Sequence, residues 1–279
     1  MKWTIVFDSG CDLRNFDPIP SADLKLVPLT LLVGEHQVVD DGTTSLEDFQ
    51  ALLDREKGRT GSACPSVGDW QHIMEDCENC IVITLAATLS GSYQSACIAR
   101  DMVLENQPDR NIFVLDSCSA SAGMQFMVDK AIELVEQDCD FATVCRELEV
   151  MREHTKVFLM LQNVDNLISN GRLNIVLGKA LKALRLCIVG NLSPDGTLSV
   201  TGKVRDMNAA MEKAISQAVE CGCTGRRLRV THCLNPEGAK VLENKLRQRF
   251  PDADIQVQRN ALLCGYYVEK GGLLLSFTE

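Results

Sequence analysis

Three polar segments stand directly after predicted strands, and their residue types could bind an anion. Residues 8–12 (DSGCD) follow the first strand, residues 88–92 (TLSGS) the third, and residues 116–119 (DSCS) the fourth. Ligands of open α/β sheets bind beyond the carboxyl ends of the strands, so the three segments are expected to meet at one cleft. The candidate cleft-lining residues in the first and last segments are Asp8, Ser9, Asp116 and Ser117.

The candidate anion-binding residues stand at the start of a predicted helix: Ser90, Gly91 and Ser92. Backbone amides at a helix N-terminus favour negative charge, and serine hydroxyls add hydrogen-bond donors without adding a charge. The same residue types are ordinary helix N-caps, which is enough to explain any one of these loops taken alone. Three such loops at one sheet edge favour a binding site.

Residues 60–66 (TGSACPS) are expected to connect two helices as a capped turn, with Ser66, a further candidate cleft-lining residue, at the start of the second helix. Neither GxxxxGK[ST] nor GxGxxG occurs, so a self-contained nucleotide site of those types has no support. Cys77-x-x-Cys80 precedes a strand instead of opening a helix, and no second pair has zinc-ligand spacing, so neither a redox pair nor a metal site is expected. The chain also lacks a GxSxG elbow, so no catalytic residue is assigned.

The elements that must position these residues alternate between strands and helices in the first half, as in a doubly wound parallel sheet. We expect an N-terminal domain over residues 1–156. Its predicted strands are 3–7, 25–33, 80–86 and 112–115, and its predicted helices are 46–56, 67–77, 92–105, 119–136 and 141–153.

The pattern restarts at residues 157–161, so residues 157–279 are expected to form a C-terminal α/β domain with a mixed sheet. Pro194-Asp195-Gly196 is a turn signal that predicts an antiparallel hairpin. The predicted fold class is therefore α/β, with two lobes and a cleft between them. Predicted strands are 186–192, 197–204, 227–232, 254–258 and 272–278; predicted helices are 174–184, 206–220 and one carrying the stripe Ala239, Leu242, Leu246 and Phe250.

The composition disfavours nucleic acid and membrane surfaces as partners. The 279 residues contain 28 Lys and Arg against 38 Asp and Glu, a net charge of −10, which phosphate backbones and anionic lipids repel. No window offers the roughly 18 apolar residues of a spanning helix, and the N-terminus lacks a secretory signal pattern. The 13 cysteines are odd in number and scattered, which indicates reduced thiols and a cytoplasmic protein.

Several motifs together resemble the DegV family, in its order and rough spacing, from residue 4 to about residue 277. The most specific is LSGSYQSA at residues 89–96; the others are DSGCDL at 8–13, VPL at 27–29, SACPS at 62–66, Asp116-Ser117, NGR at 170–172 and KVR at 203–205. The resemblance implies a two-domain α/β protein that holds one long-chain fatty acid. It also implies an acyl-binding subunit that presents the carboxylate to a separate ATP-binding subunit of a bacterial fatty acid kinase, with ATP and Mg²⁺ on that partner.

By the same resemblance, Ser62 and Ser90 contact the carboxylate, with the amides of Gly91 and Ser92 beside them. Arg172, Lys203 and Arg205 would lie next to the cleft, where they could meet phosphate or the partner; a solvated basic surface is the alternative. The acyl chain is expected within the N-terminal lobe.

The sequence departs from the family pattern at three places. Asn170 replaces the first glycine of a GGR motif, Ala63-Cys64 replace Ser-Gln, and Tyr267 stands where many members carry histidine. A phenol stays neutral near pH 7, so steps that need an imidazolium are in doubt, whereas lipid binding is less affected. The competing hypothesis is a stand-alone hydrolase or transferase acting on a small acidic or phosphorylated metabolite in the same cleft; a short polar pocket behind Ser90 would favour it.

Overall fold

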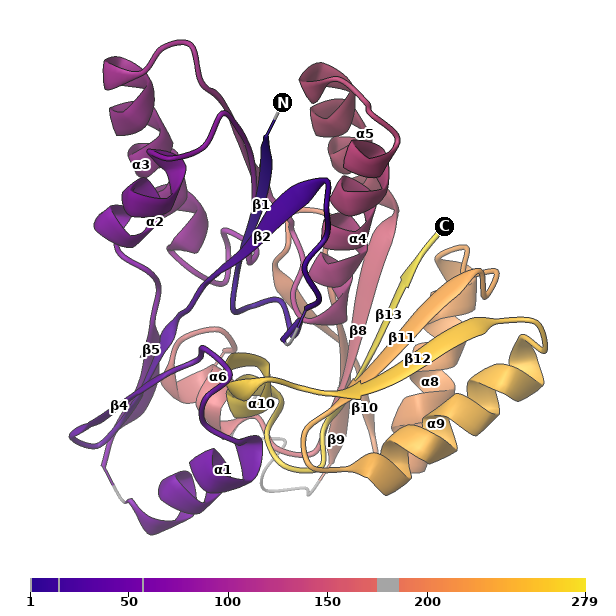
Figure 1. Ribbon diagram of the computed structural model, residues 1–279. Coiled ribbons are helices and arrows are strands. Elements are labelled where there is room, and N and C mark those ends of the chain that lie inside the picture. The colour runs from indigo at the N-terminus through magenta and orange to yellow at the C-terminus, as the bar shows by residue number, and fades with distance from the viewer. Residues whose placement is uncertain (1, 15, 57, 175–185) are drawn as a thin grey trace.

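The computed structural model describes residues 2–14, 16–56, 58–174 and 186–279, and its first layer is a parallel sheet (Figure 1). The strand order is β2-β1-β6-β7, and all three neighbouring pairs are parallel. All six residues of β1 and of β6 are buried, as expected for central strands covered on both faces. The strands are β1 (Trp3–Asp8), β2 (Ala22–Val27), β6 (Asn79–Thr84) and β7 (Asn111–Asp116).

Helices cover both faces of this sheet, which confirms the doubly wound prediction. One face carries α2 (Val67–Met74) and α3 (Ser92–Asn106), and the other carries α4 (Ala122–Glu136) and α5 (Phe141–His154) (Figure 1). Helix α4 also contacts the strands of the second large sheet. This double contact explains why residues 122–128 of α4 are all buried.

The second large sheet is mixed, as predicted, with the order β10-β9-β8-β13-β11-β12. Only β11 and β12 pair in parallel among these neighbours in the described residues. β9 and β10 form the predicted antiparallel hairpin around residues 193–197. The strands are β8 (Thr155–Leu161), β9 (Cys187–Leu192), β10 (Leu198–Val204), β11 (Arg227–His232), β12 (Asp254–Arg259) and β13 (Leu273–Thr278), and the helices packed on them are α8 (Met207–Glu220) and α9 (Pro236–Arg249).

A small antiparallel sheet, β4-β3-β5, corrects two predictions. The single strand expected over residues 25–33 is divided into β2 and β3 (Thr30–Val33), because Pro28 between them has no N–H for a sheet ladder. Residues 60–66 are not only a turn: β5 (Thr60–Ala63) pairs with β3, opposite Leu31 and Leu32. The remaining strand, β4 (His36–Val39), was not predicted.

Two further short helices were not predicted. α10 (Leu262–Val268) packs against both α6 (Asp165–Ser169) and α1 (Leu46–Arg55), so a segment near the C-terminus lies beside elements from the start of the chain (Figure 1). The helix expected over residues 174–184 lies outside the described residues. Within the described ranges, no helix is both long and apolar enough to cross a membrane.

Candidate functional site

Asp8, at the end of β1, is a buried carboxylate that fixes the loop after β6. It accepts hydrogen bonds from the Gly10 amide at 2.9 Å, the Leu85 amide at 2.9 Å and the Ser92 hydroxyl at 2.5 Å. Burial raises the pKa of Asp8 to about 6, although these hydrogen bonds favour the charged form and oppose the shift. Asp8 therefore anchors the N-terminus of α3 to the end of β1.

Ser90 and Gly91 are left with hydrogen-bond donors to offer at the start of α3. The Ser90 hydroxyl accepts from the Ser92 amide at 3.2 Å, which leaves its own hydrogen available. In the part of the chain that the structure describes, the Gly91 amide has no protein acceptor. These two donors stand at the positive end of a 15-residue helix, where a carboxylate is stabilised.

Ser62 on β5 faces Tyr267 on α10, and their hydroxyl oxygens are 2.8 Å apart. The adjacent tyrosine, Tyr266, pairs with Thr60 at 2.7 Å and accepts a hydrogen bond from Asn170 at 2.9 Å. Strand β5 and helix α10 are thus joined by two hydroxyl pairs. One of the two hydrogens of the Ser62–Tyr267 pair is not used between them and can be donated to a ligand.

Arg172 adds a positive charge to the same place. Its Nε donates to the Leu89 carbonyl at 3.1 Å, and its guanidinium carbon lies 5.8 Å from the centroid of the Tyr267 ring. Gly171 follows α6 in the left-handed conformation, with φ +75°. The chain turns here, so that the backbone amides of Arg172 and Leu173 both donate to the Leu167 carbonyl. The end of α6 therefore determines where the guanidinium lies.

A polar pocket brings these groups together, with about 580 Å³ of space not filled by protein atoms. It contains five of the predicted site residues, contributed by four separate parts of the chain. Its lining residues are Leu29, Ser62, Ala63, Cys64, Leu85, Leu89, Ser90, Gly91, Arg172, Leu263 and Tyr267.

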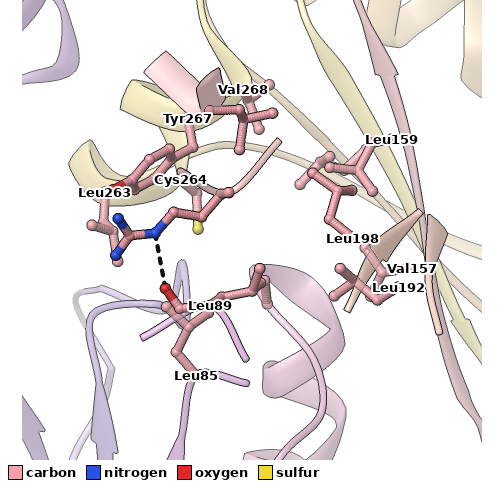
Figure 2. A pocket seen from close by; sticks show the side chains of 14 residues that line it. Leu85, Leu89, Val157, Leu159, Leu192, Leu198, Leu263, Cys264, Tyr267 and Val268 are labelled. Carbon is pink, nitrogen blue, oxygen red and sulfur yellow. Dashed lines mark hydrogen bonds between the residues drawn. The ribbon is translucent and has the colours of Figure 1, made fainter. Parts of the chain in front are cut away.

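An apolar cavity adjoins the polar pocket and shares Leu85, Leu89, Arg172, Leu263 and Tyr267 with it. Its empty space, including some open solvent, is about 620 Å³, and little of it is wide enough for a water molecule, so the cavity is a narrow slot. Figure 2 shows aliphatic side chains converging on this slot from both sides. The residues that line only the apolar cavity are Ala120, Val157, Leu159, Leu167, Leu192, Leu198, Cys264, Val268 and Leu274.

The slot does not lie within the first half of the chain, where the apolar interior was expected. Apart from Leu85, Leu89 and Ala120, all of its lining residues come from residues 157–274. The interior of the parallel sheet is instead filled by its own side chains, including Ile5, Phe7, Ile81 and Ile83, which are all fully buried. The space therefore lies against the mixed sheet, between its strands, α10 and the loops that follow β6 and β7.

Sequence reasoning missed α10 and the two acids that hold it. Ala261 at the N-cap of α10 has no side-chain cap of its own. Asp40 accepts from the amides of Leu262 and Leu263 at 3.3 and 3.0 Å, and Asp12 accepts from the Ala261 amide at 2.7 Å. These acids lie more than 200 residues away in sequence, so no local pattern could have indicated them.

A buried charge pair supports this arrangement. The Arg14 guanidinium lies 2.8 Å from Asp40, and the two side chains are only 13% and 1% exposed. Arg14 also donates to the Cys11 carbonyl at 2.6 Å and the Leu13 carbonyl at 2.8 Å. Asp40 is therefore both the counter-charge of Arg14 and the cap of α10.

Four other candidate cleft residues are engaged in hydrogen bonds with the protein, two of them between loops and two within their own loop, and they do not line the described pocket. The Ser9 hydroxyl accepts from the Leu29 amide at 2.9 Å, and Asp116 accepts from the Ala87 amide at 3.1 Å. The Ser117 hydroxyl donates to the Ser119 carbonyl. Ser66, the N-cap of α2, accepts from the Asp69 amide.

Lys203 and Arg205 are exposed at the end of β10 and do not line the pocket. Cys77 and Cys80 lie in a buried cluster with residues of α2, and the hydrogen bond between the two sulfurs lowers the pKa of Cys77 and raises that of Cys80. Among the described residues, no group of three or more His, Cys, Asp or Glu side chains could hold a metal ion.

Comparisons with known proteins agree with the motifs. A model of the family described as "Uncharacterised protein, DegV family" matches residues 2–278. A DegV domain-containing protein of Streptococcus pneumoniae is 34% identical over 279 residues, covering 99% of each chain.

Two solved structures are similar along almost the whole chain. The Fak B3 protein of Streptococcus pneumoniae fatty acid kinase, loaded with linoleic acid, has a TM-score of 0.95 at 34% identity, covering 100% of this chain and 99% of that one. A DegV family protein of Eubacterium eligens, loaded with heptadecanoic acid, has a TM-score of 0.92 at 29% identity and 99% coverage of both. The resemblance inferred from the motifs is confirmed: this chain belongs to the DegV family.

Proposed function

We propose that this chain binds one long-chain fatty acid, with its carboxylate in the polar pocket and its tail in the adjoining apolar slot. The observation that carries the proposal is the junction of the two: available hydrogen-bond donors at one end of a narrow space with aliphatic walls. A molecule with one acidic head and one long apolar tail matches this arrangement, because its polar group and its apolar chain also lie at opposite ends.

The head group would be held by several donors at once. The Ser90 hydroxyl, the Gly91 amide and the free hydrogen of the Ser62–Tyr267 pair can all donate to carboxylate oxygens. Burying an unpaired carboxylate costs several kcal/mol, and these bonds, the N-terminus of α3 and the Arg172 charge offset that cost.

The tail would gain from leaving water, about 0.8 kcal/mol for each buried methylene. The slot that receives it is lined by Leu, Val, Ala, Cys, Tyr and Arg side chains, and its polar groups belong to the end shared with the polar pocket. A small acidic or phosphorylated metabolite would leave this slot empty. The geometry therefore favours a lipid carrier over a stand-alone enzyme acting on such a metabolite.

We further propose that the chain does not catalyse a reaction alone but presents the carboxylate to an ATP-dependent kinase subunit. Its similarity to Fak B3 supports this role. Exposed Lys203 and Arg205 offer positive charge for a partner or a phosphate on a chain whose net charge is −10. ATP and Mg²⁺ would belong to the kinase subunit, where phosphoryl transfer depends on positioning and charge stabilisation.

Native mass spectrometry of the protein purified from cells tests the binding proposal. We expect a complex with one fatty acid, and reloading with oleate or palmitate after delipidation. Protein that carries no fatty acid and takes up neither acid would contradict the proposal. A separate experiment tests whether the chain presents the acid to a kinase. The loaded protein is mixed with a kinase subunit and ATP, and any acyl phosphate that forms is trapped with hydroxylamine.

A further inference from the structure

The end of the apolar slot away from the polar pocket is formed by the β9–β10 hairpin. Leu192 ends β9 and Leu198 begins β10, and both line the slot together with Val157 and Leu159 of β8. Figure 2 shows these four side chains on the opposite side of the space from Tyr267 and Leu263. A tail that enters from the polar pocket would therefore meet the hairpin with its methyl end.

The turn between Leu192 and Leu198 is held by its own hydrogen bonds. Asp195 accepts from the Ser193 hydroxyl at 2.6 Å and from the Thr197 amide and hydroxyl at 3.2 and 3.0 Å. The Ser193 amide donates to the Thr197 carbonyl at 2.9 Å. The two leucines flank this closed turn directly, so their backbone positions are fixed relative to each other.

The turn is also pressed against the first half of the chain. Gly196 has φ +81°, and a Cβ added there would lie 2.7 Å from the Ala86 Cβ and 3.0 Å from the Cys118 Cα. These neighbours belong to the loops that follow β6 and β7. The turn therefore has no room to move towards these loops, and the hairpin forms a closely packed wall.

We infer that Leu192 and Leu198 determine the length of acyl chain that this protein accepts. The inference rests on the proposed fatty acid binding and adds the residues that set its specificity. A fatty acid whose methyl end just reaches the two leucines buries its whole tail. A longer one must fold within a narrow slot or leave its head group out of the polar pocket.

Smaller side chains in the wall should raise the preferred acyl length, and larger ones should lower it. Leu198→Ala or Leu192→Ala removes three carbons from the wall, so the slot should accept tails about two methylenes longer. Each extra methylene that becomes buried favours binding by about fourfold, from about 0.8 kcal/mol of transfer free energy. Leu198→Phe advances the wall and should shift the preference towards shorter chains.

Competition loading tests this inference. Delipidated protein is mixed with an equimolar series of even-numbered saturated fatty acids from laurate to behenate, and the bound acids are identified by native mass spectrometry. Val200→Ala is the matched control, because Val200 is also on β10 but does not line the slot. We expect longer acids on the alanine variants, shorter acids on Leu198→Phe, and the wild-type profile on Val200→Ala.

Two outcomes would overturn the inference separately from the proposed function. Loaded Leu198→Ala and Leu198→Phe proteins with the wild-type length profile would show that the hairpin does not set the length. The same conclusion would follow if Val200→Ala shifted the profile as strongly as Leu198→Ala. Failure of the wild-type protein to bind any acid of the series would instead contradict the proposed function.

Discussion

The two sides of the polar pocket are held by buried carboxylates of different kinds. On one side, Asp8 accepts only from neutral donors, in its own loop and in the segment that leads into α3. On the other, Asp40 faces the Arg14 guanidinium and caps α10, which carries Tyr267. Asp8 joins strand ends within one sheet, whereas Asp40 joins segments from opposite ends of the chain. The comparison suggests that Asp8 orders the head-group donors and that Asp40 keeps the pocket assembled.

Replacement of Asp40 should have the largest effect. Asp40→Ala leaves Arg14 buried without its counter-charge and the Leu262 and Leu263 amides of α10 without their acceptor, a loss of about 3–5 kcal/mol in the free energy of unfolding. Urea unfolding measures this loss. Asp23→Ala, which breaks the exposed Lys2–Asp23 pair, is the control and should leave the unfolding midpoint unchanged. Equal, small effects of both substitutions would show that Asp40 stabilises the fold no more than an exposed carboxylate does.

The pH dependence of stability should reveal the raised pKa of Asp8 in the folded state. Its folded-state pKa of about 6 lies above the unfolded value of about 3.9, so the folded state binds the proton more tightly. The stabilisation is complete below about pH 4 and is lost as the pH rises through about 6. The lost stabilisation is about 3 kcal/mol, since each pKa unit is worth about 1.4 kcal/mol.

Asp8→Asn removes this titration. The difference in unfolding free energy between wild type and Asp8→Asn should therefore change between about pH 4 and pH 6.5, with the wild type losing stability relative to the variant. A difference that stays constant over this range, or one that changes with the opposite sign, would show that the pKa of Asp8 is not raised on folding.

Removal of single head-group donors should have the smallest effects. Ser90→Ala deletes a hydroxyl that can donate to the carboxylate and should weaken fatty acid binding by about 1–3 kcal/mol. Tyr267→Phe is the matched comparison and should weaken binding less, because the Ser62 hydroxyl then becomes free to donate. Titration calorimetry with oleate measures both. Unchanged affinity of Ser90→Ala would mean that the carboxylate lies elsewhere.

The same comparison explains what could be predicted from the sequence. The loop at residues 88–92 was recognisable because strand, cap residues and helix follow one another locally, and the structure places its Ser90 and Gly91 in the polar pocket. The hairpin at Pro194–Gly196 was predicted for the same reason. The helix α10 was not predicted, because its caps, Asp12 and Asp40, are distant in sequence.

Strand β5 was missed for a related reason: its four residues have strand structure through pairing with β3, which is nearly 30 residues earlier. Strand pairing and packing between the two sheets also decide where the empty space lies, so the slot could not be located from residue types. The motifs nevertheless led to Ser62, Arg172 and Tyr267, which the fold brings together in one pocket with Ser90 and Gly91.

A crystal structure of the protein loaded with a fatty acid brominated at its terminal carbon tests the central claim most directly. The account predicts carboxylate oxygens within hydrogen-bond distance of the Ser90 hydroxyl and the Gly91 amide, and anomalous density for bromine beside Leu192 and Leu198. A bromine inside the parallel sheet of the first half, or a carboxylate away from the start of α3, would contradict it.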